Sequence, residues 1–484
     1  MKSLLVAGFV SAALGLSAEV VENVGYTVLS DGRVEISYTL NTAPVIVTLS
    51  ALSGDEPVDG INFRQVSGDV NKEIATTGTK KIWWRPADDT AAPDGSSANN
   101  AAANALLKGA AVRVTAWQID DPPDVMVVDL SDPFYGDARV KYYEDVASLP
   151  GGLLDNPVYR FQKLVMKRVR ANGVEWLSGC AYCGTTDFGN AKYDPYTTYP
   201  GGQEYPCRRK LDHDYYCAVF ELTKGQHSML AGALKGGRYN LKGERFLRPA
   251  DSLSFIAVRG GVNHFYPEPP DPESILGRLR SRTGIKFDLP GEYEWEFAAW
   301  AGHGPDVITY DYTTVGSKIG YWGNGTPYDV SKGQCRDDGL PGRYACNSGY
   351  YDPETLEQSA DWSSSHIYGP TNATAYCGSY SPNDFGLYDM HGNVSEWCLD
   401  YYTKNNNSGI TAPINANGLE PRYGTVDGKD VTTNRVVRGG SYLSPMKSCR
   451  SSYRGDRISS FADGGVAQVG CRVVCPIVGR MIAE

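Results

Sequence analysis

Residues 383–402 read NDFGLYDMHGNVSEWCLDYY, and this stretch contains the best candidate for a metal site in the chain. Asp389 and Glu396 supply carboxylates, and Gly392 and Val394 can offer backbone carbonyls from a turn. Hard oxygen donors at alternating positions of a loop suit Ca²⁺, which accepts six to eight oxygens. The alternative is that both carboxylates cap the turn by accepting hydrogen bonds from backbone N–H groups.

A second stretch, RGGSYLSPMKSCRSSYR at 438–454, combines a glycine pair, several arginines and one cysteine, Cys449. Gly439 and Gly440 indicate a backbone conformation that no Cβ would permit. The polar residues of this region could form an anion pocket, since Arg makes bidentate pairs with carboxylates and phosphates. We expect instead that they bond internally to carbonyls and carboxylates, because irregular backbone must be satisfied. These residues are Arg438, Ser441, Arg450, Arg454 and Arg472.

One segment, DLPGEYEWEFAAWAG at 288–302, has a clear helical pattern. Tyr293, Phe297 and Trp300 are spaced as one apolar stripe. Three glutamates stand in the first turns, where the helix dipole favours negative charge. We interpret them as helix-start charge on a solvated face.

The helical segment and the stretch 383–402, together with NRVVRGGSY at 434–442 and GCRVV at 470–474, resemble the sulfatase-modifying-factor family, which has the fold of the formylglycine-generating enzyme. YYCAVFELTKGQ at 215–226 and KLVMKRVRANGVEWLSG at 163–179 are similar to the family's early strands. The resemblance covers about two thirds of the chain and keeps the family's order. It implies a loop-rich α+β domain related in shape to C-type lectins. It also implies that Asp389, Gly392, Val394 and Glu396 match a structural calcium site.

The family's enzyme oxidises a substrate cysteine to formylglycine and holds Cu(I) with two cysteines. The resemblance places these positions at Ser444 and Cys449, so only the second one matches. A serine hydroxyl is a hard ligand and cannot replace a soft thiolate on Cu(I). We therefore expect no formylglycine-generating activity.

The chain has 11 cysteines, an odd number, so at least one does not pair within it. The preferred partner of Cys449 is Cys398, because the family fold lines one core with both motifs; Cys471 is a competing partner or a buried thiol. Cys335 and Cys346 bracket a short loop and could close it. Cys180 and Cys183 form a CxxC, which with Cys207 and Cys217 indicates disulfides more than zinc, since no second CxxC follows.

The chain begins MKSLLVAGFVSAALGLSAEV, a pattern typical of a secretory signal peptide, over residues 1–18. The apolar run is too short to span a membrane comfortably, and no later stretch is long enough to span one. We expect export to the periplasm, the cell surface or the medium, which permits disulfides. The net charge of -10 argues against a nucleic-acid partner.

Short alternating segments such as GRVEISYTL at 32–40 predict strands separated by turns. With no helical pattern between them, they predict a small all-β sandwich over 19–130. The Ala-, Asn- and Ser-rich insert 91–105 is interpreted as a loop. Proline and glycine mark 131–158 as a linker, and 159–478 is the domain that resembles the family.

Together these features predict an exported protein that binds or scaffolds, with an unidentified protein or glycan as its ligand and calcium as a structural ion. The alternative is a metal-dependent oxidoreductase of the formylglycine-generating or non-haem iron type, which would need copper or iron. The six histidines are far apart, and none forms a helical i, i+4 metal pair.

Overall fold

The computed structural model describes residues 20–53, 56–57, 63, 66–86, 111–131, 139–178, 180–183, 207–231, 246–261, 264, 268–302, 306–308, 319–321, 327–329, 334–335, 374–380, 382–401, 425–426, 429–430, 434–442, 449, 451–459 and 468–477. The predicted signal peptide, the insert 91–105, Ser444, Cys346 and Arg450 lie outside these ranges, as does the side chain of Cys335. The chain divides into two compact units, one up to Leu164 and the other spanning Val165–Pro476. Each unit is described by itself.

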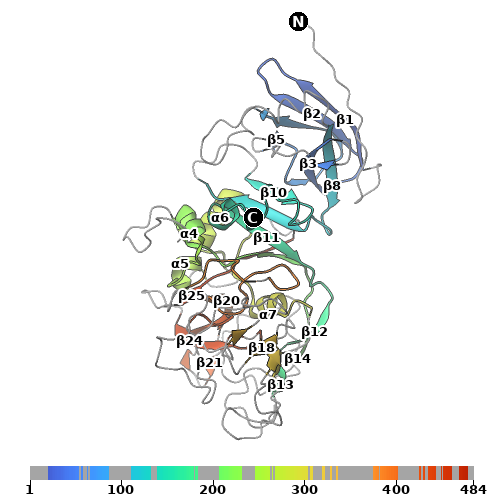
Figure 1. The fold of residues 1–484 in the computed structure, drawn as a ribbon. Helices are drawn as coiled ribbons and strands as arrows, with labels where there is room; N and C mark the ends of the chain where they lie inside the picture. The colour runs from blue at the N-terminus through green and yellow to red at the C-terminus, as the bar shows by residue number, and fades with distance from the viewer. Residues whose placement is uncertain are drawn as a thin grey trace. The chain divides into compact units, whose positions relative to one another are not determined.

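The first unit is built around a β-sandwich, as the alternating segments predict (Figure 1). One sheet has the strand order β1-β2-β7-β5, and the other pairs β3 with β4, β6 and β8. The strands are β1 (Val21–Val28), β2 (Val34–Leu40), β3 (Val45–Ser53), β4 (Glu56–Pro57), β5 (Val66–Gly68), β6 (Glu73–Ile74), β7 (Gly78–Trp84) and β8 (Ala111–Gln118).

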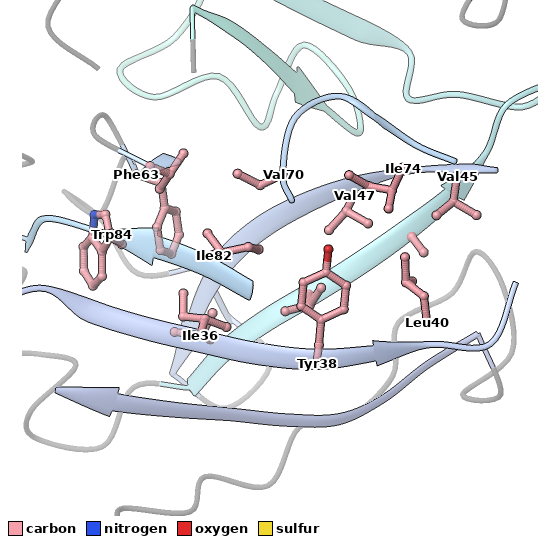
Figure 2. Close-up of a cluster of buried hydrophobic side chains, with 14 of the residues drawn as sticks. Ile36, Tyr38, Leu40, Val45, Val47, Phe63, Val70, Ile74, Ile82 and Trp84 are labelled. Atoms are coloured by element: carbon pink, nitrogen blue, oxygen red, sulfur yellow. The ribbon is translucent and has the colours of Figure 1, made fainter. Parts of the chain in front are cut away.

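Side chains from both sheets fill the core of this unit. Residues of β2 alternate between buried and partly exposed positions, so that Ile36, Tyr38 and Leu40 point inward. They pack against Val45 and Val47 of the facing sheet. Trp84, from β7 of the same sheet as β2, belongs to the same core (Figure 2). Burial of this apolar surface holds the two sheets together.

Residues 139–164 continue the first unit with more regular structure than a linker pattern predicts. β9 (Val125–Asp129) and β10 (Val140–Tyr143) pair antiparallel, and the short helix α3 (Val158–Phe161) follows. Leu149, Leu153 and Val158 of this region are buried. The glycines Gly151 and Gly152 both have positive φ, which explains the turn signal in the sequence.

The second unit is an α+β domain with short helices and several small sheets. Strand β15 lies between β11 and β26, and β20 lies between β23 and β25. The helices are α4 (Lys224–Ala231), α5 (Phe255–Arg259), α6 (Ile275–Thr283) and α7 (Glu292–Trp300). The strands are β11 (Lys163–Val169), β12 (Glu175–Ser178), β13 (Cys180–Cys183), β14 (Cys207–Lys210), β15 (Tyr215–Ala218), β16 (Asp306–Ile308), β17 (Ile319–Tyr321), β18 (Pro327–Asp329), β19 (Gln334–Cys335), β20 (Ser395–Tyr401), β21 (Thr425–Val426), β22 (Lys429–Asp430), β23 (Asn434–Arg438), β24 (Gly455–Ser459), β25 (Val469–Gly470) and β26 (Val474–Pro476).

The predicted helix forms α7, but its glutamates do not face solvent. Glu292, Glu294 and Glu296 are all buried, at 3%, 6% and 5% exposure. The interpretation of a solvated face is therefore wrong. The helix is surrounded on every side, with Phe297 and Trp295 in apolar contacts and the glutamates paired to cations from distant segments.

Among the residues that the structure describes, no helix is both long enough and apolar enough to cross a membrane.

Candidate functional site

The segment 388–396 forms a tight loop that leads into β20. Three residues within five positions have positive φ, Asp389 at 58°, Gly392 at 90° and Asn393 at 62°. Such a run turns the backbone sharply, which only glycine and short polar residues adopt readily. The loop is closed by Gly392 N, which donates to the carbonyl of Gly439 at 2.7 Å.

The glycine pair is essential to this contact. Gly439 and Gly440 have φ of 85° and 68°, which confirms the expectation that a Cβ is not tolerated there. A Cβ on Gly439 would lie 3.0 Å from Cζ2 of Trp295 and 3.3 Å from the carbonyl oxygen of Met390. The glycine therefore allows β23 to approach both α7 and the loop.

The structure gives different partners to Asp389 and Glu396, the two carboxylates among the four predicted calcium ligands. Asp389 is buried, and its Oδ2 accepts a hydrogen bond from Gly378 N at 2.7 Å. Both carboxylate oxygens of Glu396 bind other side chains. Its Oε1 accepts from Arg472 Nη2 at 2.8 Å, and its Oε2 accepts from Trp295 Nε1 at 2.5 Å. The structure thus gives Glu396 the role of counterion to a buried arginine.

Two side chains that the sequence did not single out lie beside Asp389. The ligand atoms of Glu221, Cys377 and Asp389 all lie within 4.8 Å of one another, and all three residues are buried. Glu221 accepts from Val394 N at 2.9 Å and from Asn393 Nδ2 at 2.6 Å, which fixes it against the loop. Burial, with repulsion from Asp389 and Glu396, raises the pKa of Glu221 well above its usual value.

This donor set fits a hard cation in part. The carboxylates of Asp389 and Glu221 are suitable oxygen ligands for calcium. The thiol of Cys377 is not, because burial and the neighbouring Glu221 hold its pKa well above the usual value and keep it neutral. Sequence reasoning missed Glu221 because it lies 172 residues from Asn393 and carries no local metal spacing.

Three arginines of the predicted polar cluster bond internally. Arg438 pairs with Glu296 and donates to the carbonyls of Ser451 and Ser452. Arg454 Nη2 donates to Glu292 Oε2 at 2.8 Å.

Arg472 adds carbonyl contacts to its pair with Glu396, donating to Ala218 and Tyr388. Ser441 Oγ donates to Gln468 Oε1 at 2.9 Å. These bonds correspond to the structural alternative rather than to an open anion pocket.

The bridge predicted between Cys398 and Cys449 is not formed. Both residues are buried and carry thiols, as do Cys217, Cys377, Cys471 and Cys475. Cys398 packs in an apolar cluster with Leu387 and Val436, and burial raises the pKa of its thiol well above the usual value. Cys449 has 0% exposure, and its carbonyl lies 2.8 Å from His391 Nδ1.

Residues 250–477 match the family described as the sulfatase-modifying factor enzyme 1-like domain. The chain carries a domain of this family. The formylglycine-generating enzyme of Thermomonospora curvata is 28% identical over 190 residues, which are 38% of this chain and 48% of that protein. The chaperone protein LppX of Paenibacillus barcinonensis is 24% identical over 307 residues, 58% of this chain and 89% of that protein.

Among solved structures, the chain aligns with PvdO from Pseudomonas aeruginosa at a TM-score of 0.39 and 18% identity, over 65% of this chain and 94% of that one. Treponema denticola variable protein 1 aligns at 0.37 and 16% identity, over 65% and 95%.

Proposed function

We propose that this protein is an exported binding or scaffolding member of the sulfatase-modifying-factor family that does not generate formylglycine. The observation that carries the proposal is the buried thiol of Cys449, with 0% exposure. A copper-binding, substrate-oxidising thiolate needs access, whereas a thiol enclosed by protein is inert. Ser444, at the partner position of the family's cysteine pair, adds no soft ligand.

A binding role is also supported by one relative. The Paenibacillus barcinonensis protein is named a chaperone, and the alignment spans 89% of it. A chaperone acts by holding another protein rather than by changing a bond. The ligand of the present chain would be another protein or a glycan, met outside the cytoplasm after removal of residues 1–18.

The chemistry is tested by incubating the full chain with Cu(I), a thiol reductant, oxygen and a cysteine-containing sulfatase peptide. We expect no aldehyde on the peptide by mass spectrometry and hydrazide labelling. The Thermomonospora curvata enzyme, assayed in parallel, provides the positive control. Repeated turnover by the wild-type chain, abolished in C449S, would overturn the proposal and favour the oxidoreductase alternative.

We further propose a structural calcium ion at the loop that contains Asp389. Asp389 and Glu221 would hold it, with carbonyls of Gly392 and Val394 as additional oxygens, and the ion would offset the buried negative charge there. Calcium should raise the melting midpoint by a few degrees over chelated protein, since a ligand that binds only the folded state stabilises it. D389N should lose this response, whereas D384N, at an exposed site nearby, should keep it. A midpoint that is the same with chelator and with calcium would refute the site.

A further inference from the structure

The sandwich of the first unit has an outer face that its core does not use. In the sheet β1-β2-β7-β5, the inward residues Ile36, Ile82 and Trp84 belong to the core (Figure 2). Side chains of neighbouring positions in a strand point to opposite sides. Glu35 and Trp83 therefore lie on the outer face, where both remain partly exposed.

Trp83 is the aromatic centre of this face. It stands directly opposite Glu35 on β2 and opposite Ser67 on β5. Its Nε1 donates to Glu35 Oε2 at 3.2 Å, which fixes the indole laterally. Gly68 lies beside the ring, because a Cβ there would be 3.0 Å from two carbons of the indole. With φ of 94°, Gly68 makes room for the ring at the edge of the sheet.

Polar side chains occupy neighbouring positions of the same outer face, as the register of the strands shows. Lys81 Nζ lies 3.0 Å from Glu35 Oε1, and these side chains keep 49% and 26% exposure. Ser37 stands opposite Lys81 in the same register, and Thr27 stands opposite Glu35 on β1. One aromatic ring is thus bordered by hydroxyls, one ammonium and one carboxylate, whose charges cancel.

We propose that this outer face, formed by Thr27, Glu35, Ser37, Ser67, Lys81 and Trp83, binds a neutral oligosaccharide. A pyranose has one face of C–H groups, which packs on an aromatic ring, and a rim of hydroxyls, which exchange hydrogen bonds with charged and hydroxyl side chains. Both requirements are met here within neighbouring register pairs. The proposal rests on the binding function above and gives it a ligand class.

The composition of the face separates this ligand from others. An anionic polymer would need an excess of cations, yet Lys81 is balanced by Glu35. A protein partner of ordinary affinity would need a larger apolar centre than one half-buried indole. A neutral polyol, in contrast, loses no charge complementarity at these six residues, whose two charges cancel.

The test is affinity electrophoresis of the full chain in gels that contain a neutral polysaccharide, run separately with β-glucan, xylan, galactomannan and soluble chitin. We expect at least one of them to retard the wild-type chain. W83A should weaken that binding about tenfold or more, corresponding to about 1.4 kcal/mol. W83F, which keeps the ring, should retain most of it.

The matched control is W117A, on the other sheet of the sandwich, whose indole also bonds one side chain, Thr48. It should be retarded as the wild type is, and near-ultraviolet circular dichroism should show all variants folded. No retardation by any of the four polysaccharides, or equal retardation of wild type and W83A, would overturn the proposal. Neither result bears on aldehyde formation, so a failure here leaves the proposed lack of formylglycine chemistry standing.

Discussion

The carboxylate of Glu396 is paired with the guanidinium of Arg472 at 2.8 Å, and the two side chains are 1% and 0% exposed. The arginine lies 76 residues further along the chain, next to β25 and β26. Its remaining N–H groups donate to carbonyls of Ala218, Val219 and Tyr388. One side chain thus joins the end of β15, strand β20 and the loop that contains Tyr388.

Removing Arg472 should strongly destabilise the second unit. R472M leaves Glu396 and three carbonyls without a cation, and breaking a buried pair costs about 3–5 kcal/mol. Urea unfolding of the full chain, followed by tryptophan fluorescence, measures the loss. R278M is the control, since Arg278 and Glu273 are exposed and such pairs contribute about 0–1 kcal/mol. Equal midpoints for the two variants would show that the buried pair is not a structural centre.

The contacts of Arg472 illustrate which features the sequence cannot predict, namely partners that are distant along the chain. A helical period predicts α7, and the residues DMHGNVSEW predict a polar loop, because both signals are local. The partners of the α7 glutamates come from far away, as Glu292 and Arg454 are separated by 162 residues. From the sequence alone, a glutamate on a helix is therefore predicted to be exposed to solvent, because the distant cation that pairs with it is not known.

The same limit applies to the candidate metal site. The sequence places Asp389 in a glycine-containing turn, but Glu221 follows β15 and becomes a neighbour of Asp389 only through the fold. The expectation of a Cys398–Cys449 bridge was wrong for a similar reason. A high cysteine count suggests bridges, whereas the apolar surroundings of Cys398 favour a packed thiol.

Asp400 should make the protein less stable as pH rises. Burial, and then repulsion from Glu292, raises the pKa of Asp400 from 3.8 to about 7 in the folded state. The folded protein therefore binds a proton that the unfolded chain has lost, so stability falls between pH 3.8 and 7 and stays low above that range.

D400N fixes the neutral form and keeps an oxygen that can accept the Glu292 N–H, which Asp400 Oδ2 accepts at 2.5 Å. We expect D400N to exceed the wild type by about 1 kcal/mol at pH 8, with the gain vanishing near pH 4. Thermal melts across this range measure it. D145N, at an exposed turn of the first unit, serves as the control. A D400N variant that is less stable at pH 8 would contradict the expectation.

His213 should contribute stability in a higher pH window. Burial opposes its charge, but Glu294, at 2.8 Å, and Asp212 outweigh burial and raise the pKa of His213 from 6.5 to about 9. The contribution is complete below pH 6.5 and is lost as pH rises through 9. Glu294 also accepts from Gly291 N at 2.6 Å, so the histidine steadies the start of α7.

H213Q should therefore cost about 1–2 kcal/mol at pH 6 and much less at pH 10. The comparison variant is H264Q, because His264 lies at a more exposed position and its Nδ1 contacts the carbonyl of Pro269. Denaturant unfolding at both pH values gives the change in the free energy of unfolding for each variant relative to the wild type. If the cost of H213Q were the same at pH 6 and pH 10, the ion pair with Glu294 would not be its source.

Cys398 and Cys449 should both behave as protected thiols. In the folded protein, where each is 0% exposed, alkylation by iodoacetamide should be slow, since the reagent needs an exposed thiolate. In denaturant without reductant, both should be modified at once, because no bridge joins them. Peptide mass mapping gives the extent at each site, and W83A or W117A, altered in the other unit, should not change the rates. A Cys398–Cys449 linked peptide in the non-reduced digest would show that the disulfide forms after all. Cys449 would then carry no thiol, and its buried thiol could not explain a lack of copper chemistry.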